Sequence, residues 1–215
     1  RLTDLLTSMG GTCVLTETPE MFGAETILMN RSCTFDVFEA QTKMINGFKE
    51  YFTSYGQPIY ENPSPGNKEG GITTLEEKSL GCIQKGGTAP VADVLSYGER
   101  IKKRGLTLLN GPGNDIVSST ALTAAGVHMI IFTTGRGTPL GAPVPTIKMS
   151  TNTALYEKKP NWIDFNAGTL LEGDDFDKKL RELLDFVISV ASGRQTNNEI
   201  NDYREIAIWK NGVTL

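Results

Sequence analysis

The chain has 215 residues, 39% of them hydrophobic, so it can bury a full core as one domain or form a large part of a bigger protein. Its formal net charge of −4 argues against a general nucleic-acid or membrane-surface binder, and no apolar run approaches the roughly 20 residues of a membrane span. Three cysteines without a Cys-x-x-Cys pair suit a reducing cytoplasm, and the single histidine, His128, excludes a multi-histidine metal site from this chain alone.

The start of the chain predicts a helix over residues 3–9, ended by Gly10-Gly11, and a strand over residues 12–16. Because the sequence enters this helix without an initiator methionine or a leading tail, we expect a piece of a longer protein, cut near a domain boundary. The acidic residues that follow the strand are Glu17, Glu20 and Glu25. They are candidate metal ligands, and the more common alternative is that they are solvated loop acids and acids of a helix's first turn.

A long amphipathic helix is predicted over residues 35–55, with Gly56 at its end. Its apolar positions at near-helical spacing are Phe35, Phe38, Ile45, Phe48 and Phe52. This stripe is expected to face the core rather than a cofactor. Residues 62–67, Asn-Pro-Ser-Pro-Gly-Asn, are expected to form an irregular connector.

Residues 67–88 combine paired glycines with three lysines. Thr74 and Glu77 fit a capping box at the start of a short helix. The lysines are Lys68, Lys78 and Lys85. Cations on flexible backbone in a net-acidic chain favour an anion site, although their spacing is not that of a phosphate-binding P-loop. Cys82 is expected to be a packed cysteine, with a ligand or a nucleophile as the alternatives.

The middle of the chain predicts a strand, a helix and a second strand, at residues 106–109, 116–125 and 127–133. Asp115 is placed to cap the helix and Gly126 to stop it. We expect the two strands to point the same way in one sheet and to be joined by a right-handed crossover. The loops after them would then lie on one carboxyl edge of a sheet, where open α/β sheets bind ligands.

The expected edge combines the loops at residues 110–115, 133–138 and 150–152. Its candidate ligand-binding side chains are Asn114, Asp115, Thr133, Thr134 and Arg136. Arg136, within Thr-Thr-Gly-Arg-Gly-Thr, is placed to grip a carboxylate with two hydrogen bonds. The alternative is a solvent-facing loop arginine.

The rest of the chain predicts a strand at residues 146–150, a short helix at 151–158, a strand-like run at 161–166 and an amphipathic helix at 175–192. Residues 204–215 are expected to form an edge strand or a hairpin around Asn211-Gly212. The alternation of strands and helices predicts an α/β fold, a mainly parallel sheet with flanking helices in Rossmann-like layers. Residues 1–215 are expected to be a single catalytic-type domain.

Long motifs across the chain resemble the altronate/galactarate dehydratase family. They are Glu17-x-Pro19-Glu20-x-x-Gly23-Ala24-Glu25, Pro63-Ser64-Pro65-Gly66-Asn67-Lys68, Gly70-Gly71-x-Thr73-Thr74-x-Glu76-Glu77-Lys78-Ser79-Leu80-Gly81, Lys85-Gly86-Gly87, Phe132-Thr133-Thr134-Gly135-Arg136-Gly137, Thr151-Asn152-Thr153 and Asp164-Phe165-Asn166-Ala167-Gly168. The resemblance covers essentially all of the chain. The Gly-Asn-Asp loop and the Asp-Phe-Asn-Ala-Gly run are more similar to the altronate enzymes.

The resemblance implies a cytoplasmic hydro-lyase of hexonate and hexarate catabolism that depends on a divalent metal, Fe²⁺ or Mn²⁺. It implies dehydration of a small anionic sugar acid, altronate preferred and galactarate next, to a 2-keto-3-deoxy acid. A sulfo-lyase that acts on sulfolactate is a related branch. Full members carry an upstream N-terminal portion, so a further domain or subunit is an expected partner, and the isolated chain is expected to be inactive if that portion supplies ligands. A homo-oligomer is compatible with this family, whereas nucleic acid and membrane are not expected partners.

Dehydration removes a proton α to a carboxylate and expels the β-hydroxyl, so it needs a base, an acid and positive charge on the enediolate. Without a histidine at the site, the residues favour a lysine base with carboxylate metal ligands. The candidate catalytic residues, expected to share one cleft, are Lys68, Lys78 and Arg136. The candidate substrate-binding residues are Asn67, Asn114, Thr133, Thr134, Arg136 and Asn152, and the candidate metal ligands are Glu17, Glu25 and Asp115. The alternative function is a non-catalytic module whose glycine loops bind an anionic metabolite or a partner subunit.

Overall fold

The computed structural model describes residues 1–60, 63 and 65–212 and divides the chain into two compact units. Unit 1 consists of Arg1–Ala125 and the chain end from Ile208, and unit 2 consists of Gly126–Ala207. In sequence, unit 2 is therefore an insertion into unit 1. Whether these two units act together as one catalytic-type domain stays a prediction.

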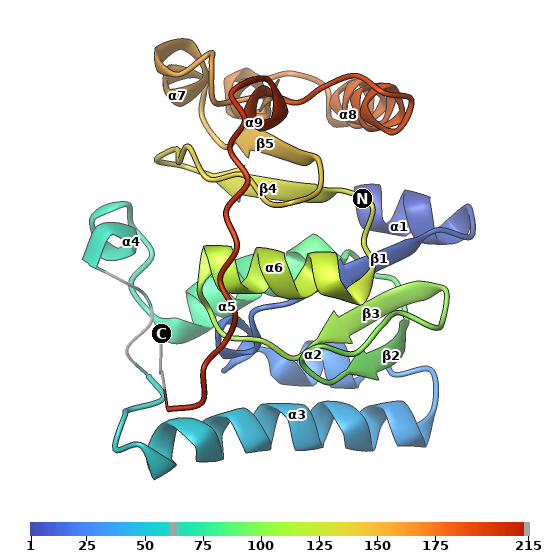
Figure 1. Cartoon of the computed structure of the whole chain (residues 1–215), viewed down its shortest axis with the longest axis vertical. Helices are drawn as coiled ribbons and strands as arrows, with labels where there is room; N and C mark the ends of the chain where they lie inside the picture. Colours follow the sequence, from blue (N-terminus) through green and yellow to red (C-terminus); the bar gives the residue numbers. More distant parts are fainter. Residues whose placement is uncertain (61–62, 64, 213–215) are drawn as a thin grey trace. The chain divides into compact units, whose positions relative to one another are not determined.

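Unit 1 is built on a parallel sheet of three strands in the order β1-β3-β2 (Figure 1). The strands are β1 (Thr12–Leu15), β2 (Val91–Leu95) and β3 (Gly105–Leu109). The helices are α1 (Leu2–Ser8), η1 (Thr18–Met21), α2 (Glu25–Met29), α3 (Phe35–Ser54), α4 (Pro65–Glu69), α5 (Leu75–Ile83), η2 (Gln84–Gly86) and α6 (Asp115–Ala125). β3 is the central strand, because β1 and β2 occupy its two sides.

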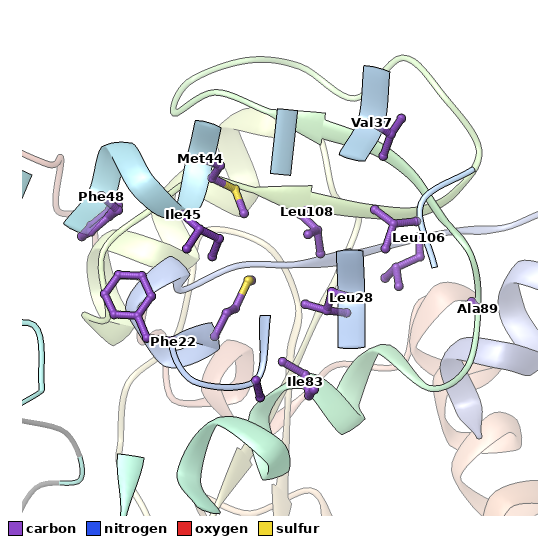
Figure 2. Close-up of a cluster of buried hydrophobic side chains, with 13 residues drawn as sticks. Phe22, Leu28, Val37, Met44, Ile45, Phe48, Ile83, Ala89, Leu106 and Leu108 are labelled. Carbon is purple, nitrogen blue, oxygen red and sulfur yellow. The ribbon is translucent and has the colours of Figure 1, made fainter. Parts of the chain in front are cut away.

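Side-chain alternation along the strands gives the unit 1 sheet two apolar faces. Leu106 and Leu108 of β3 pack into a core with side chains of α2, α3 and α5, as Figure 2 shows. The next residue along the strand, Leu109, packs instead with Ala121 and Ala125 of α6. Each of these leucines is at most 1% exposed, and burying a leucine side chain contributes roughly 1.5–3 kcal/mol. The sheet is therefore held between helices on both faces, as the sequence predicts.

Unit 2 contains a second parallel sheet, in the order β4-β5-β6. Its strands are β4 (Ile130–Thr134), β5 (Thr146–Ser150) and β6 (Phe165–Asn166), and its helices are α7 (Thr153–Lys158), η3 (Gly168–Glu172), α8 (Phe176–Ala191) and α9 (Asn197–Ile200). The central strand, β5, carries Lys148, which is 0% exposed. Its Nζ donates a hydrogen bond to the Thr138 carbonyl at 3.1 Å. Two parallel sheets with flanking helices confirm the predicted α/β class.

The prediction that the strands on either side of α6 share one sheet is wrong. β3 pairs with β1 and β2 in unit 1, whereas β4 pairs with β5 in unit 2. The physical reason is that β1 and β2 occupy both sides of β3, while β4 forms its backbone hydrogen bonds with β5 instead. The loops at 110–115 and 133–138 therefore do not follow strands of the same sheet. The loops at 133–138 and 150–152 do share an edge, as predicted, because β4 and β5 are parallel neighbours.

The helix-capping predictions are confirmed for α5 and corrected for α6. Thr74 and Glu77 form the predicted capping box. At α6, the Asn114 Oδ1 accepts a hydrogen bond from the Val117 backbone N at 3.2 Å. Asn114 is therefore the N-cap, and Asp115, predicted to be the cap, is the first helical residue. The reason is that both residue types accept this bond, so sequence alone does not distinguish the two positions.

Two segments predicted to be irregular or extended differ in the structure. Within the expected connector, α4 begins at Pro65, because a fixed φ suits proline to the first helical position. Residues 62 and 64 of this connector lie outside the described residues. The described residues from 204 to 212 form no strand or hairpin, and residues 213–215 lie outside the described part.

The chain end instead packs on unit 1 through Trp209. Its ring stacks on Phe48 of α3 with 5.2 Å between the ring centroids and lies edge-on to Tyr51 and Tyr97. The Trp209 backbone N also donates to the Tyr97 hydroxyl at 2.8 Å. Trp209 thus joins the core that contains α3. Within the described residues, no helix has the length and apolar character needed to cross a membrane.

Candidate active site

The loops that follow β1 and β3 are joined at the carboxyl edge of the unit 1 sheet. Thr18 is 0% exposed, and its backbone N donates to the Gly111 carbonyl at 2.9 Å. Its hydroxyl donates a hydrogen bond to Asn110 Oδ1 at 2.9 Å and accepts one from the Gly111 N at 3.2 Å. These bonds fix the start of η1 against the loop before α6. Acidic residues from both loops are thereby brought together.

Glu17, between β1 and η1, combines an unusual backbone with a buried carboxyl group. Its φ of 67° lies in the left-handed region, which is costly for a residue with a Cβ. The Ser118 hydroxyl of α6 donates to Glu17 Oε1 at 3.1 Å. Burial, together with the charges of Glu20 and Asp115, raises the pKa of Glu17 to about 7 against the opposing charge of Lys85. Such a carboxyl group can exchange protons near neutral pH.

Glu20, one turn further along, uses both of its carboxylate oxygens. Oε1 lies 2.8 Å from the Lys78 Nζ, and Oε2 accepts a hydrogen bond from the Cys82 Sγ at 2.9 Å. Burial alone would raise the pKa of Glu20, but the Cys82 hydrogen bond and the Lys78 charge lower it overall. Burial and the Glu20 carboxylate raise the pKa of Cys82 to about 12. The thiol is therefore a protonated donor rather than an activated nucleophile.

Asp115 and Lys85 complete an arrangement that we call the acid–cation cluster. Its members are Glu17, Glu20, Lys78, Cys82, Lys85 and Asp115. Burial and the Glu20 charge raise the pKa of Asp115, and the charges of Lys85 and Lys78 oppose that rise. Lys85 is exposed, and its ammonium forms no ion pair with any residue in the described part of the chain. The cluster thus contains one cation committed to Glu20 and another that can meet an anionic ligand.

Other predicted site residues of unit 1 have different surroundings. Glu25 forms an ion pair with Lys49 at 2.7 Å. Lys68 is exposed on the short helix α4, which also contains Asn67. Asn114 caps α6 at the border of the cluster. The cleft predicted to be shared by Lys68 and Lys78 stays a prediction, since the structure places only Lys78 in the cluster.

A second group of predicted residues gathers at the carboxyl edge of the unit 2 sheet. Asn152 donates through Nδ2 to the Gly135 carbonyl at 3.0 Å and accepts from the Leu155 N at 2.9 Å, as the N-cap of α7. The Thr134 hydroxyl accepts from the Gly137 N at 2.9 Å. Thr133 precedes this turn at the end of β4. These side chains build the loop, and exposed Arg136 at its tip has no ion pair within the residues that the structure describes.

Comparison with known proteins identifies the family to which the chain belongs. The family described as D-galactarate/altronate dehydratase, C-terminal, matches residues 1–214. The chain belongs to this family.

Relatives within the D-galactarate/altronate dehydratase family include two altronate dehydratases. The chain is 60% identical to that of Bacillus subtilis (strain 168) over 216 residues, which is 100% of the chain and 44% of the relative. It is 57% identical to that of Escherichia coli (strain K12) over 215 residues, 100% of the chain and 43% of the relative. Galactarate dehydratase (L-threo-forming) of Escherichia coli (strain K12) is 37% identical over 194 residues, 89% of the chain and 37% of the relative. The chain spans less than half the length of these relatives.

The described residues contain no set of ligands for the divalent metal that the family resemblance implies. Within residues 1–60, 63 and 65–212, no three His, Cys, Asp or Glu side chains form a group that could hold a metal ion. Glu20 is engaged by Lys78 and Cys82, and the predicted ligand Glu25 by Lys49. Glu17 and Asp115 alone are too few for a divalent ion, which takes about four to eight ligands.

Sequence reasoning left Lys85 and Ser118 out of the site and did not single out Lys148. Lys85 stands in the Lys85-Gly86-Gly87 motif, but its distance from Glu17 along the chain hides their proximity. Ser118 stands with Ser119 and Thr120 at a helix start, where backbone N–H groups favour an anion, but nothing in the sequence indicates its bond to Glu17. Lys148 carries the one signal that could have been used, because a lysine in the middle of the run Thr146–Ser150 interrupts a buried strand.

Proposed function

We propose that the protein containing this chain is a cytoplasmic lyase that dehydrates a sugar acid, altronate preferred and galactarate next, to a 2-keto-3-deoxy acid. The acid–cation cluster carries this proposal, because it combines a carboxyl group of pKa about 7 with an ammonium group close enough to influence it. The names of the relatives support the same substrate class. Because the chain matches 43–44% of the altronate dehydratases, we propose that a further domain or subunit completes the site.

In the proposed reaction, the Glu17 carboxylate accepts the proton on the carbon next to the substrate carboxylate. The electron pair of that C–H bond moves onto the carboxylate and forms an enediolate. The neighbouring C–O bond then breaks, and the departing hydroxyl takes the proton back from Glu17 and leaves as water. The resulting enol rearranges to the 2-keto-3-deoxy acid. A single group with a pKa near neutral can take and return the proton, which suits Glu17 to both steps.

Glu17 replaces a lysine as the proposed base for a geometric reason. Lys78 is held 2.8 Å from Glu20, and an ammonium in an ion pair has no lone pair to accept a proton. Lys68 is exposed on α4. The proposed Fe²⁺ or Mn²⁺ would have to take ligands from outside the described residues, which contain no group of three such side chains. A cationic side chain then supplies positive charge near the enediolate.

The direct test of the function uses the full-length protein. A panel of hexonates and hexarates is supplied with Fe²⁺ or Mn²⁺, and the 2-keto-3-deoxy product is measured. We expect turnover of altronate above that of galactarate. Binding of a sugar acid without any product across the whole panel would instead identify a non-catalytic module.

Arg136 is proposed to bind substrate oxygen atoms with its paired donors. Arg136→Lys keeps the charge but loses the planar fork, so kcat/KM is expected to fall about ten- to hundred-fold, with a larger fall for Arg136→Ala. The thermal midpoint should not change, because Arg136 is exposed. Steady-state kinetics and thermal unfolding of the full-length variants check both expectations. A lysine variant as active as wild type would rule out the two-pronged contact.

A further inference from the structure

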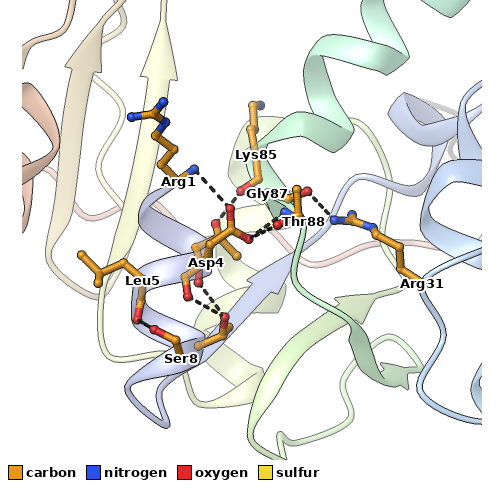
Figure 3. A network of polar contacts seen from close by, with 10 residues as sticks. Arg1, Asp4, Leu5, Ser8, Arg31, Lys85, Gly87 and Thr88 are labelled. Atoms are coloured by element: carbon orange, nitrogen blue, oxygen red, sulfur yellow. Dashed lines mark hydrogen bonds and ion pairs between the residues drawn. The ribbon is translucent and has the colours of Figure 1, made fainter. Parts of the chain in front are cut away.

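The backbone around Lys85 is fixed by a network from three parts of unit 1, which we call the Asp4 clamp (Figure 3). Asp4 of α1 accepts a hydrogen bond from the Thr88 backbone N at 2.7 Å through Oδ1. The Arg31 guanidinium donates to the Gly87 carbonyl. The Thr3 hydroxyl donates to the carbonyl of Lys85 itself at 2.5 Å. These contacts immobilise η2 and the residues that follow it.

Gly87 makes the clamp dependent on the absence of a side chain. Its φ is +57°, and a Cβ at this position would lie 2.4 Å from Asp4 Oδ1. The carboxylate of Asp4 therefore occupies the space that any other residue would need. The Asp4 clamp and Gly87 together determine where the Lys85 side chain begins.

The Lys85 side chain leads away from the clamp, as Figure 3 shows. η2, which contains Lys85, packs on β1, and a Cβ at the next residue, Gly86, would lie 3.8 Å from Leu15 Cδ2 at the end of that strand, two residues before Glu17. The Lys85 charge also lowers the pKa values of Glu17, Glu20, Cys82 and Asp115. Lys78 also has a charge in this region, but its ammonium is held by Glu20 at 2.8 Å. Lys85 makes no such pair with the residues described here. It is thus the cluster cation that can receive a negatively charged group.

The chemistry of the proposed reaction requires a cation next to the base. The proton to be removed sits on the carbon bonded to the substrate carboxylate, so that proton is only two bonds from the carboxylate carbon. The side chain that binds the carboxylate must therefore neighbour Glu17. Lys85 meets this condition, because η2 packs on β1, the strand that Glu17 follows.

We propose that Lys85 binds the reacting carboxylate of the sugar acid and that the Asp4 clamp positions it to do so. This proposal rests on the proposed function of the same site. An ammonium group makes charge-assisted hydrogen bonds to carboxylate oxygens, and these oxygens gain negative charge as the enediolate forms. Lys85 consequently contributes both to binding and to the chemical step.

The test compares kinetic constants of the full-length protein and its variants with altronate as substrate. Lys85→Met, which keeps the length and removes the charge, is expected to raise KM and lower kcat, so that kcat/KM falls about tenfold or more. Lys85→Arg should recover most of the loss. Lys43→Met, at an exposed position of α3, is the matched control and should behave as wild type.

Positioning by the clamp is tested with Gly87→Ala and the milder Asp4→Asn. Each should lower kcat/KM while the Lys85 charge is still present, and thermal unfolding identifies a variant that does not fold. If the wild type is active and Lys85→Met has the same kinetic constants, Lys85 does not bind the reacting carboxylate. The proposed function is then unaffected. If the wild type turns over no sugar acid, the proposed function fails. Calorimetric binding of altronate to wild type and Lys85→Met then decides the carboxylate contact by itself.

Discussion

Glu17→Gln is expected to lower kcat of the full-length protein by about a hundredfold or more, the scale of a general acid–base group. The amide keeps the size of the side chain and can still accept the Ser118 hydrogen bond, but it cannot take a proton from the substrate. Steady-state kinetics with altronate measure the loss. Glu39→Gln, at an exposed site on α3, is the control and should retain full activity. Comparable activity in Glu17→Gln and wild type would remove Glu17 from the mechanism.

The pH dependence of the wild type separates this role from a structural one. Glu17 must be ionised to accept the proton, so kcat/KM should rise as pH increases through about 7. The residual activity of Glu17→Gln should lack this rise. If kcat/KM of Glu17→Gln rises with pH as that of the wild type does, a group other than Glu17 causes the rise.

Glu17 should also reduce stability at high pH. Its folded-state pKa of about 7 lies above its ordinary value of 4.5, so the folded state holds the proton more tightly. Ionisation therefore lowers stability progressively as pH rises from about 4.5 to about 7, and the loss stays constant above that window. Glu17→Gln removes this loss, and its thermal midpoint should exceed that of the wild type by more at pH 8 than at pH 5.

Lys148→Met is expected to lower the free energy of unfolding by about 1–3 kcal/mol, the usual cost of leaving a buried hydrogen-bond acceptor unsatisfied. Burial lowers the pKa of Lys148, while the charges of Asp164 and Glu205 oppose that shift. Methionine fills similar space but removes one of the two positive charges, those of Lys148 and Arg194, that act on the buried Asp164 carboxyl group. It also loses the hydrogen bond to the Thr138 carbonyl, which lies in the loop after Arg136.

Urea unfolding followed by circular dichroism measures this effect. Lys158→Met, an exposed lysine in the last turn of α7, is the matched control and should change stability by less than about 0.5 kcal/mol. A Lys148→Met protein that unfolds at the wild-type urea concentration would show that the charges do not depend on one another.

The predictions that succeeded depend on short stretches of sequence. The capping box of Thr74 and Glu77 involves neighbouring residues, and every strand except β2 was recognised from a local run of residues. Pairing between strands was harder, because nothing in the run 106–109 says that β1 and β2 occupy both of its sides. The left-handed backbone of Glu17 was likewise hidden, since its conformation is set by bonds between Thr18 and a loop more than 90 residues away.

The candidate site was predicted in part for the same reason. Glu17, Lys78 and Asp115 were selected by residue type and do meet in one cluster. Lys85 was noted as a cation but was not assigned to the site, because its relation to Glu17 is created by the fold. Glu25 was chosen by the same chemical argument as Glu17, yet its neighbour is Lys49. Composition identifies the candidates, and only tertiary contacts distinguish a group that is engaged from one that can react.

The packing of Trp209 has a consequence for the order in which the protein can mature during synthesis. Residues 126–207 leave the ribosome before Trp209 does, so unit 2 has all of its residues while unit 1 still lacks one of its aromatic side chains. Until then, Phe48 and Tyr97 have no indole ring to cover them. Unit 1, whose first residues are translated before unit 2, therefore completes its core only after unit 2 has been translated. A nascent chain stalled before residue 208 should expose this aromatic surface to chaperones and proteases.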